Sequence, residues 1–128
     1  MDSINNRRIR WTVLYFLVIA LLSLAPFRVK KFLETRGFLH YIGHFGAFVV
    51  CGVLVLADTA APRARLLRLA VVLTFCAALE ALEAVLYHNP FEWKDLIVDY
   101  LAVGFSPFAL YACQALLRRL GVFQTTQN

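Results

Sequence analysis

Charged residues are scarce in this chain of 128 residues: Asp, Glu, Lys and Arg make up 16% of it, against about 25% in an average soluble domain. Hydrophobic residues reach 61%, and the mean hydropathy is +0.68. The sequence also lacks any polar stretch long enough to form a separate soluble domain. These shortages exclude an ordinary soluble enzyme, and they predict a single integral membrane domain over residues 1–128.

Cysteine is present at only three positions, and each lies in a different apolar segment. Cys51, Cys76 and Cys113 have no metal-ligand spacing, and thiols inside a bilayer do not form a disulfide framework. Because a free cysteine packs as a small hydrophobe, we expect all three in the helix core.

Four apolar stretches approach or reach the roughly 20 residues that a spanning helix needs. We predict an all-α polytopic protein, a bundle of four transmembrane helices at about 9–25, 38–57, 66–87 and 96–117. Between the first two, residues 27–37 alternate apolar with basic residues, which favours a short interfacial helix. Pro26 follows the small residue Ala25 and disfavours cleavage by signal peptidase, so we expect the first segment to remain a helix.

The net charge of +5 does not indicate a nucleic-acid partner, because the basic residues cluster at the ends of the apolar segments. In an up-and-down bundle, eight of them fall on one side, namely Arg7, Arg8, Arg10, Arg63, Arg65, Arg68, Arg118 and Arg119. The other side has five, namely Arg28, Lys30, Lys31, Arg36 and Lys94. The positive-inside rule therefore favours both termini in the cytoplasm, with the chain in the inner membrane.

Six ionisable residues form three close pairs, and the same topology brings all three pairs to the extracytoplasmic side. The pairs are His40 with His44, Glu80 with Glu83, and Asp95 with Asp99. Residues three or four apart share one helix face. Ionisable groups beside hydrocarbon are costly, so a layer of them predicts a functional site.

Within this layer we expect an inner set of His44, Glu80, Glu83 and Asp99, with His40, His88 and Asp95 closer to water. His44 is the partner that we expect for Glu80 by depth. Structural interpretations stand beside the functional one: His40 as an interfacial imidazole, Asp95 as an acid at a helix N-terminus, and interhelical hydrogen bonds for the rest. Histidine and carboxylates suit zinc or manganese, but a helical His-Glu-x-x-His arrangement is absent, so we predict no metal and no cofactor.

Three stretches resemble the VanZ-like family of small bacterial membrane proteins. They are His40-Tyr-Ile-Gly-His44-Phe-Gly-Ala-Phe48 with Gly52, Glu80-Ala-Leu-Glu83, and Phe91-Glu-Trp-Lys-Asp95-Leu-Ile-Val-Asp99. His44, Glu80 and Asp95 match positions of the family pattern, whereas Glu83 and Asp99 stand where glutamine and asparagine are usual. The resemblance implies a cell-envelope protein associated with exopolysaccharide or with teicoplanin-type antibiotic resistance.

We therefore predict an accessory role in the handling of an envelope glycopolymer or glycopeptide, in which the acidic site binds a polar or cationic group. The binding candidates are Glu83, Asp99 and His40. A first rival is a membrane-embedded hydrolase or transferase for a lipid-linked substrate, with His44, Glu80 and Asp95 as its acid–base residues. A second rival is an assembly subunit whose polar groups only lock helices together. The lipid bilayer is the expected partner, and a second copy or another membrane protein is left open.

Overall fold

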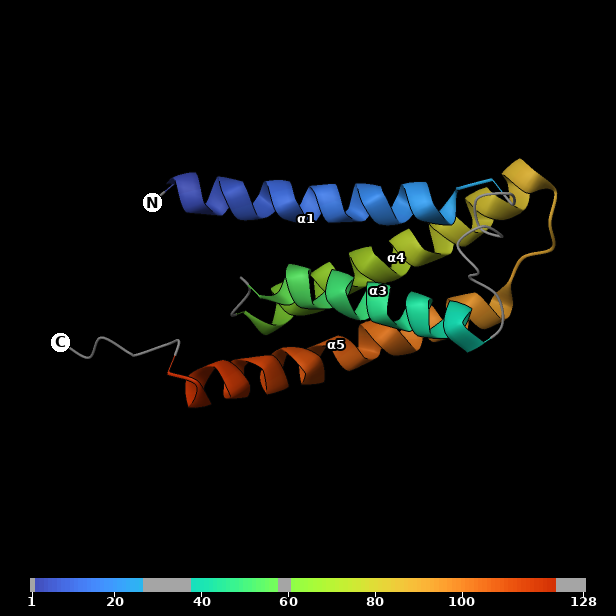
Figure 1. Ribbon diagram of the computed structural model, residues 1–128. Coiled ribbons are helices and arrows are strands. Elements are labelled where there is room, and N and C mark those ends of the chain that lie inside the picture. The colour runs from blue at the N-terminus through green and yellow to red at the C-terminus, as the bar shows by residue number, and fades with distance from the viewer. Residues whose placement is uncertain (1, 27–37, 58–60, 122–128) are drawn as a thin grey trace.

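The computed structural model describes residues 2–26, 38–57 and 61–121, and within these residues the regular secondary structure is all helical, without strands. Figure 1 shows four helices: α1 (Asp2–Ser23), α3 (Phe38–Leu56), α4 (Pro62–Tyr87) and α5 (Trp93–Arg119). The prediction of an all-α protein is confirmed. The short interfacial helix predicted over 27–37 lies outside the described residues.

Three of the described helices, α3, α4 and α5, are long and apolar enough to cross a membrane. The first helix differs, because it begins at Asp2 and takes in the basic cluster that was expected to precede the span. A spanning segment of 18 residues that ended with α1 at Ser23 would begin at residue 6, and it would therefore contain the charged residues Arg7, Arg8 and Arg10. About 20 Å of uninterrupted apolar helix follows Arg10 at 1.5 Å per residue, short of a hydrocarbon core of about 30 Å.

The ends of the helices follow from local chemistry. Pro62 occupies the first turn of α4, where its missing N–H costs nothing, and Ala61 before it is extended. At the other end of α4, His88 adopts a left-handed conformation with φ of 54°. Pro90 disfavours helical geometry at Asn89, so a non-helical connection separates α4 from α5.

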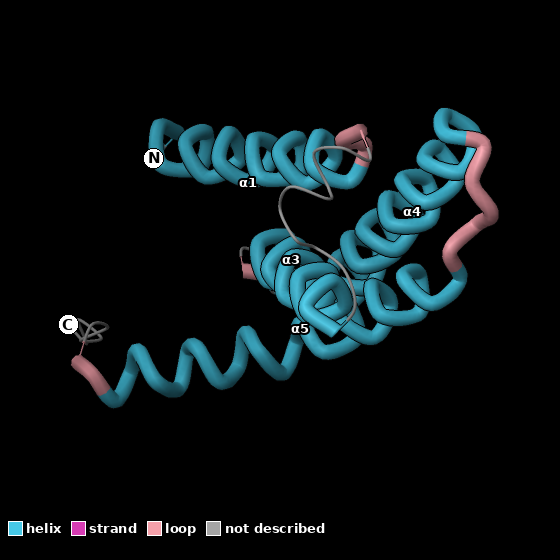
Figure 2. Tube along the Cα trace, turned by 45° about the vertical axis from the view of Figure 1, so that its right-hand side comes forward, coloured by secondary structure: helices cyan, strands magenta, loops and turns pink. Residues whose placement is uncertain are grey.

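The helices run alternately up and down, so that α3 and α5 point in the same direction (Figure 1). The most extensive contact in the bundle is between α3 and α5, with α4 packed on both of them and α1 on α3 and α4. In Figure 2, α1 lies beside α3 and α4 and apart from α5. The core between the helices consists of Ile19, Phe48, Cys51, Val72, Cys76, Leu79, Leu96, Ala102 and Val103.

The contact between α3 and α5 depends on one glycine. A Cβ added to Gly52 would collide with the Ser106 side chain, so only glycine permits this approach. Ser106 Oγ lies 3.2 Å from the carbonyl oxygen of Val49 in α3 and 3.0 Å from that of Ala102 in α5, so its single hydroxyl proton has an acceptor within reach on each helix. Gly43 and Gly46, by contrast, have nothing within 4 Å of an added Cβ.

Two tyrosines attach α1 to the rest of the bundle. Tyr15 Oη donates a hydrogen bond of 3.1 Å to the carbonyl oxygen of Ala47 in α3. Tyr87 Oη donates one of 2.6 Å to the carbonyl oxygen of Leu24, just beyond the end of α1. Because α1 makes no contact with α5 comparable to these, its position depends on α3 and α4.

Large apolar side chains cover the outside of the bundle. Phe38, Leu21 and Val85 are more than 70% exposed, and Leu101 and Phe108 are 63% exposed. Cys51 and Cys76 lie in the core as predicted, but the prediction was wrong for Cys113, which is exposed on α5. Monomeric soluble proteins do not present apolar surfaces of this extent, whereas lipid-facing helices do.

Candidate functional site

Two histidines of α3 face two aspartates of α5 at the end of the bundle where both helices begin. His40 Nε2 lies 2.8 Å from Asp95 Oδ2, and His44 Nδ1 lies 2.9 Å from Asp99 Oδ1. In each pair the ring nitrogen donates and the carboxylate accepts. The two imidazole rings are also neighbours, with centroids 4.4 Å apart. Together the four side chains form two successive rungs between α3 and α5.

Helix geometry explains why both rungs form at once. The histidines are four residues apart, as are the aspartates, so each pair lies on one face about one turn apart. Because α3 and α5 run in the same direction, both rungs join residues separated by 55 positions. The pairing found here therefore follows from equal spacing on two parallel helices.

Glu80 of α4 brings a third helix to this site. One ligand atom each from His44, Glu80 and Asp99 lie within 4.8 Å of one another. The same holds for His40, His44 and Asp95, so the two groups share His44. We call the five residues of these two groups the His-carboxylate cluster. As expected from depth, His44 and Glu80 belong together, although the direct partner of His44 is Asp99.

Burial within the cluster is uneven. The carboxylate residues are covered, with Asp99 1% exposed, Asp95 4% and Glu80 7%. The histidine side chains remain partly accessible, at 22% for His40 and 19% for His44. A ligand would thus meet imidazole edges first, with three carboxylates behind them.

Two expectations about the layer need correction. Asp95 was placed near water, but it is buried because the α3–α5 contact encloses the first turn of α5. His40, for which an interfacial position stays a prediction, has its ring paired with the Asp95 carboxylate. Glu83, expected in the inner set, is half-buried and belongs to neither group of potential ligands. His88 is exposed, as expected.

The cluster contains more acidic than basic groups. With all three carboxyl groups ionised, a net charge of −1 would remain even with both imidazole rings protonated. Acidity also extends toward the turn: partial desolvation and then the neighbouring Asp95 carboxyl raise the pKa of Glu92. Buried charge of one sign is costly unless a proton or a cation compensates it. A cationic ligand would compensate this excess of negative charge.

The arrangement supports three kinds of chemistry. Paired with Asp99 through Nδ1, the His44 ring is oriented with Nε2 left over for proton transfer, as in histidines that act as general bases. The carboxylates could bind a cationic or hydrogen-bond-donating group. Imidazole and carboxylate together could also hold a divalent metal ion.

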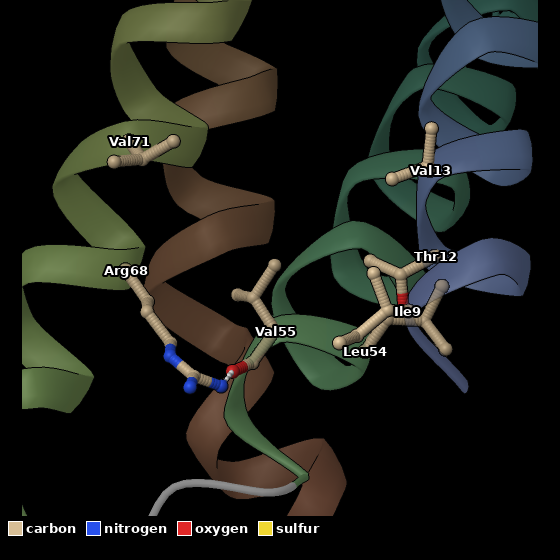
Figure 3. A pocket seen from close by; sticks show the side chains of 7 residues that line it. All are labelled: Ile9, Thr12, Val13, Leu54, Val55, Arg68 and Val71. Atoms are coloured by element: carbon tan, nitrogen blue, oxygen red, sulfur yellow. Dashed lines mark hydrogen bonds between the residues drawn. The ribbon is translucent and has the colours of Figure 1, made fainter. Parts of the chain in front are cut away.

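A cavity of about 280 Å³ lies at the opposite end of the bundle, between α1, α3 and α4 (Figure 3). Its lining is apolar apart from Thr12 and Arg68, whose guanidinium Nη1 donates a hydrogen bond of 2.9 Å to the carbonyl oxygen of Val55. No sequence pattern predicts this cavity, because its wall combines ordinary apolar residues of three helices. None of the cluster residues lines it.

Comparisons with protein-family models, with curated proteins and with solved structures found no match for this chain.

Proposed function

We propose that the chain is a multi-pass protein of the bacterial inner membrane, with α1 as a fourth span beside α3, α4 and α5. The apolar exterior supports membrane insertion. Trp11 and Trp93 are both exposed, as interfacial anchors are. As a helix of 22 residues, α1 is about 33 Å long and comparable to the membrane thickness if its arginines lie among the headgroups.

The distribution of charge supports an orientation with both termini in the cytoplasm. The arginines of α1, the start of α4 and the end of α5 belong to one end of the bundle (Figure 1). The carboxylates of the His-carboxylate cluster belong to the other end. By the positive-inside rule, the arginine end is cytoplasmic and the cluster faces the extracytoplasmic side.

The site lies at a shallow depth in this arrangement. His44 and Asp99 are each six residues into their helices, about 9 Å from the helix start. Such a depth is near the boundary between headgroups and hydrocarbon, where a polar group of a lipid-linked molecule could reach it. The ligand need not cross the membrane.

Membership of the VanZ-like family is part of the proposal. The residues that carry the resemblance, His44, Glu80 and Asp95, are all members of the cluster. Asp99, where the family pattern has asparagine, is the partner of His44. The resemblance and the geometry thus concern the same site.

The function supported best is binding of a cationic or polar group of an envelope glycopolymer or lipid-linked intermediate, in an accessory role in the glycopeptide response. The observation that carries it is the net negative, buried carboxylate group beneath two accessible imidazoles. Attraction of a cation to a partly desolvated carboxylate site is stronger than in water, because the effective dielectric constant is lower.

A second candidate is acid–base catalysis on a lipid-linked substrate. The fixed His44–Asp99 pair favours it, since a carboxylate that orients an imidazole is a recurring part of such sites. Here His44 would exchange the proton, and Glu80 would lie close enough to the same substrate to assist.

Single replacements test the proposal: His44→Gln, Glu80→Gln and Asp95→Asn, with His88→Gln as the matched control. His88 is an exposed histidine at the same end of the bundle and lies outside the cluster. Folded yield in detergent and susceptibility of cells to a teicoplanin-type glycopeptide are measured together. Normal yield with a lost phenotype in the three variants supports a site, and the control retains the phenotype. Loss of yield in all three supports the assembly role and overturns the proposal.

A further inference from the structure

We propose that the His-carboxylate cluster holds a divalent transition-metal ion, with His44, Glu80 and Asp99 as its protein ligands. This inference deepens the proposed function and rests on it, because the metal would be the cation that the negative site binds. It replaces the expectation, drawn from the sequence, that the chain has no metal site.

The first argument is geometric. One ligand atom from each of the three residues lies within 4.8 Å of the others, and the residues come from three different helices. In a tetrahedral site with metal–ligand bonds of about 2.0–2.1 Å, ligand atoms lie roughly 3.3 Å apart. His44 Nδ1 and Asp99 Oδ1 lie 2.9 Å apart in a hydrogen bond, so a metal ion bound through Nδ1 would replace the Nδ1 proton and that bond. A rotamer adjustment of the Glu80 carboxylate would close the set around a metal.

Charge balance distinguishes the inner group of His44, Glu80 and Asp99 from the outer group, which contains Asp95 as its single carboxylate. A neutral His44 with the carboxylates of Glu80 and Asp99 has a charge of −2, which a divalent ion would neutralise. The outer group of His40, His44 and Asp95 has a single carboxylate and would be left with a net positive charge. Since an uncompensated buried charge is costly, the inner group is the better match for a divalent ion.

The outer residues have a supporting role in this assignment. Asp95 holds His40 by a hydrogen bond of 2.8 Å, and the His40 ring lies against the His44 ring with centroids 4.4 Å apart. This contact restricts the orientation of the His44 imidazole.

The ligand types select the metal class. One imidazole nitrogen with two carboxylate oxygens suits Zn²⁺ or Mn²⁺, whereas Mg²⁺ and Ca²⁺ prefer oxygen ligands alone. Three protein ligands leave a fourth position open on a tetrahedral ion. A polar group of the envelope ligand could occupy that position from the side of the partly accessible His44.

The test uses Co²⁺ as a spectroscopic probe in the full-length protein, purified in detergent through a tag without histidine and stripped with a chelator. We expect one Co²⁺ per chain, visible absorption typical of four coordination, and displacement by Zn²⁺. His44→Gln, Glu80→Gln and Asp99→Asn should each lower the affinity at least tenfold. The control His88→Gln should bind as the wild type does.

A second variant keeps the test valid if a ligand replacement disturbs folding. In His44→Cys a thiolate would join the coordination, so an intense sulfur-to-cobalt charge-transfer band should appear in the ultraviolet. Failure of the folded wild type to bind Co²⁺ or Zn²⁺ overturns the metal site. If His40→Gln and Asp95→Asn lower the Co²⁺ affinity more than the three ligand variants do, the ligand assignment is overturned.

The outcome also separates the metal from the proposed function. If the folded wild type binds no metal but the glycopeptide phenotype still depends on His44 and Glu80, the site binds its ligand without an ion. If metal binds as expected and the phenotype is unaffected by the ligand variants, the metal site stands and the envelope function fails.

Discussion

His44 Nδ1 and Asp99 Oδ1 lie 2.9 Å apart, with the aspartate 1% exposed and the histidine side chain 19% exposed. One member of the pair is thus enclosed by the helices, while the other reaches the surface of the bundle. The pair joins α3 to α5 and also presents an imidazole to whatever approaches. The same two side chains therefore connect the helices and leave an imidazole partly accessible.

The coupling between His44 and Asp99 should be measurable in a double-mutant cycle in metal-free detergent solution. We expect His44→Gln and Asp99→Asn to couple by about 1–2 kcal/mol, because each removes one partner of a mostly buried hydrogen bond. The readout is the free energy of unfolding of the two single variants and the double variant. A coupling energy near zero would contradict the bond.

The Gly52–Ser106 contact predicts contrasting effects of two similar substitutions. Gly52→Ala should lower the midpoint of thermal unfolding by several degrees, because its Cβ would collide with the Ser106 side chain. Gly46→Ala is the control: nothing lies within 4 Å of the new Cβ, and alanine favours the helix by about 0.5–1 kcal/mol. Adding Ser106→Gly to Gly52→Ala should restore part of the loss. Equal behaviour of the two alanine variants would argue against the close approach.

The attachment of α1 should weaken when the Tyr87 hydroxyl is removed. Tyr87→Phe loses the hydrogen bond of 2.6 Å to the carbonyl oxygen of Leu24, worth about 1 kcal/mol. Hydrogen exchange in the last turns of α1 should accelerate, while exchange in the α3–α5 contact stays unchanged. Tyr111→Phe, at an exposed tyrosine of α5, is the control. Unaltered protection of α1 in Tyr87→Phe would show that this bond does not hold the helix.

The proposed topology predicts opposite labelling at the two ends of α4. In a background without native cysteines, His88→Cys should react with an impermeant maleimide in intact cells. Ala61→Cys should react only after the membrane is permeabilised. Both positions are exposed and flank the helix, so neither should be shielded by the bundle. Labelling of both from the same side would contradict a spanning α4 and the shared extracytoplasmic layer.

Apolar length predicted α3, α4 and α5 well, because the hydrocarbon thickness sets how many apolar residues a spanning helix needs. It predicted α1 less well, since hydropathy does not register that Arg7, Arg8 and Arg10 continue the same helix. The spacing of the polar residues within each helix predicted which of them share a helix face. It did not predict which histidine pairs with which carboxylate. The pairing depends on which helices are neighbours, and the decisive clue was the equal spacing of His40–His44 and Asp95–Asp99 on two parallel helices.

Small residues show a further limit of the sequence. Gly43, Gly46 and Gly52 look alike in the primary structure, yet only Gly52 has a neighbour close enough to exclude a side chain. The reason is that one face of α3 is covered by α5 whereas Gly43 and Gly46 lie on exposed parts of the helix. A composition of small residues indicates that close packing occurs, but the partner helix determines where.

Because the two histidine–aspartate pairs repeat at the same spacing, they do not by themselves determine how α5 is aligned along α3. If α5 slid along α3 by a single turn, about 5.4 Å, either His44 would meet Asp95 or His40 would meet Asp99, and one of the two bonds would be remade. The histidine–aspartate pairs alone therefore tolerate three alignments. Ser106 fits against α3 only where Gly52 leaves room. A contact without charge, two turns deeper than His44, thus selects the alignment in which both histidines have an aspartate.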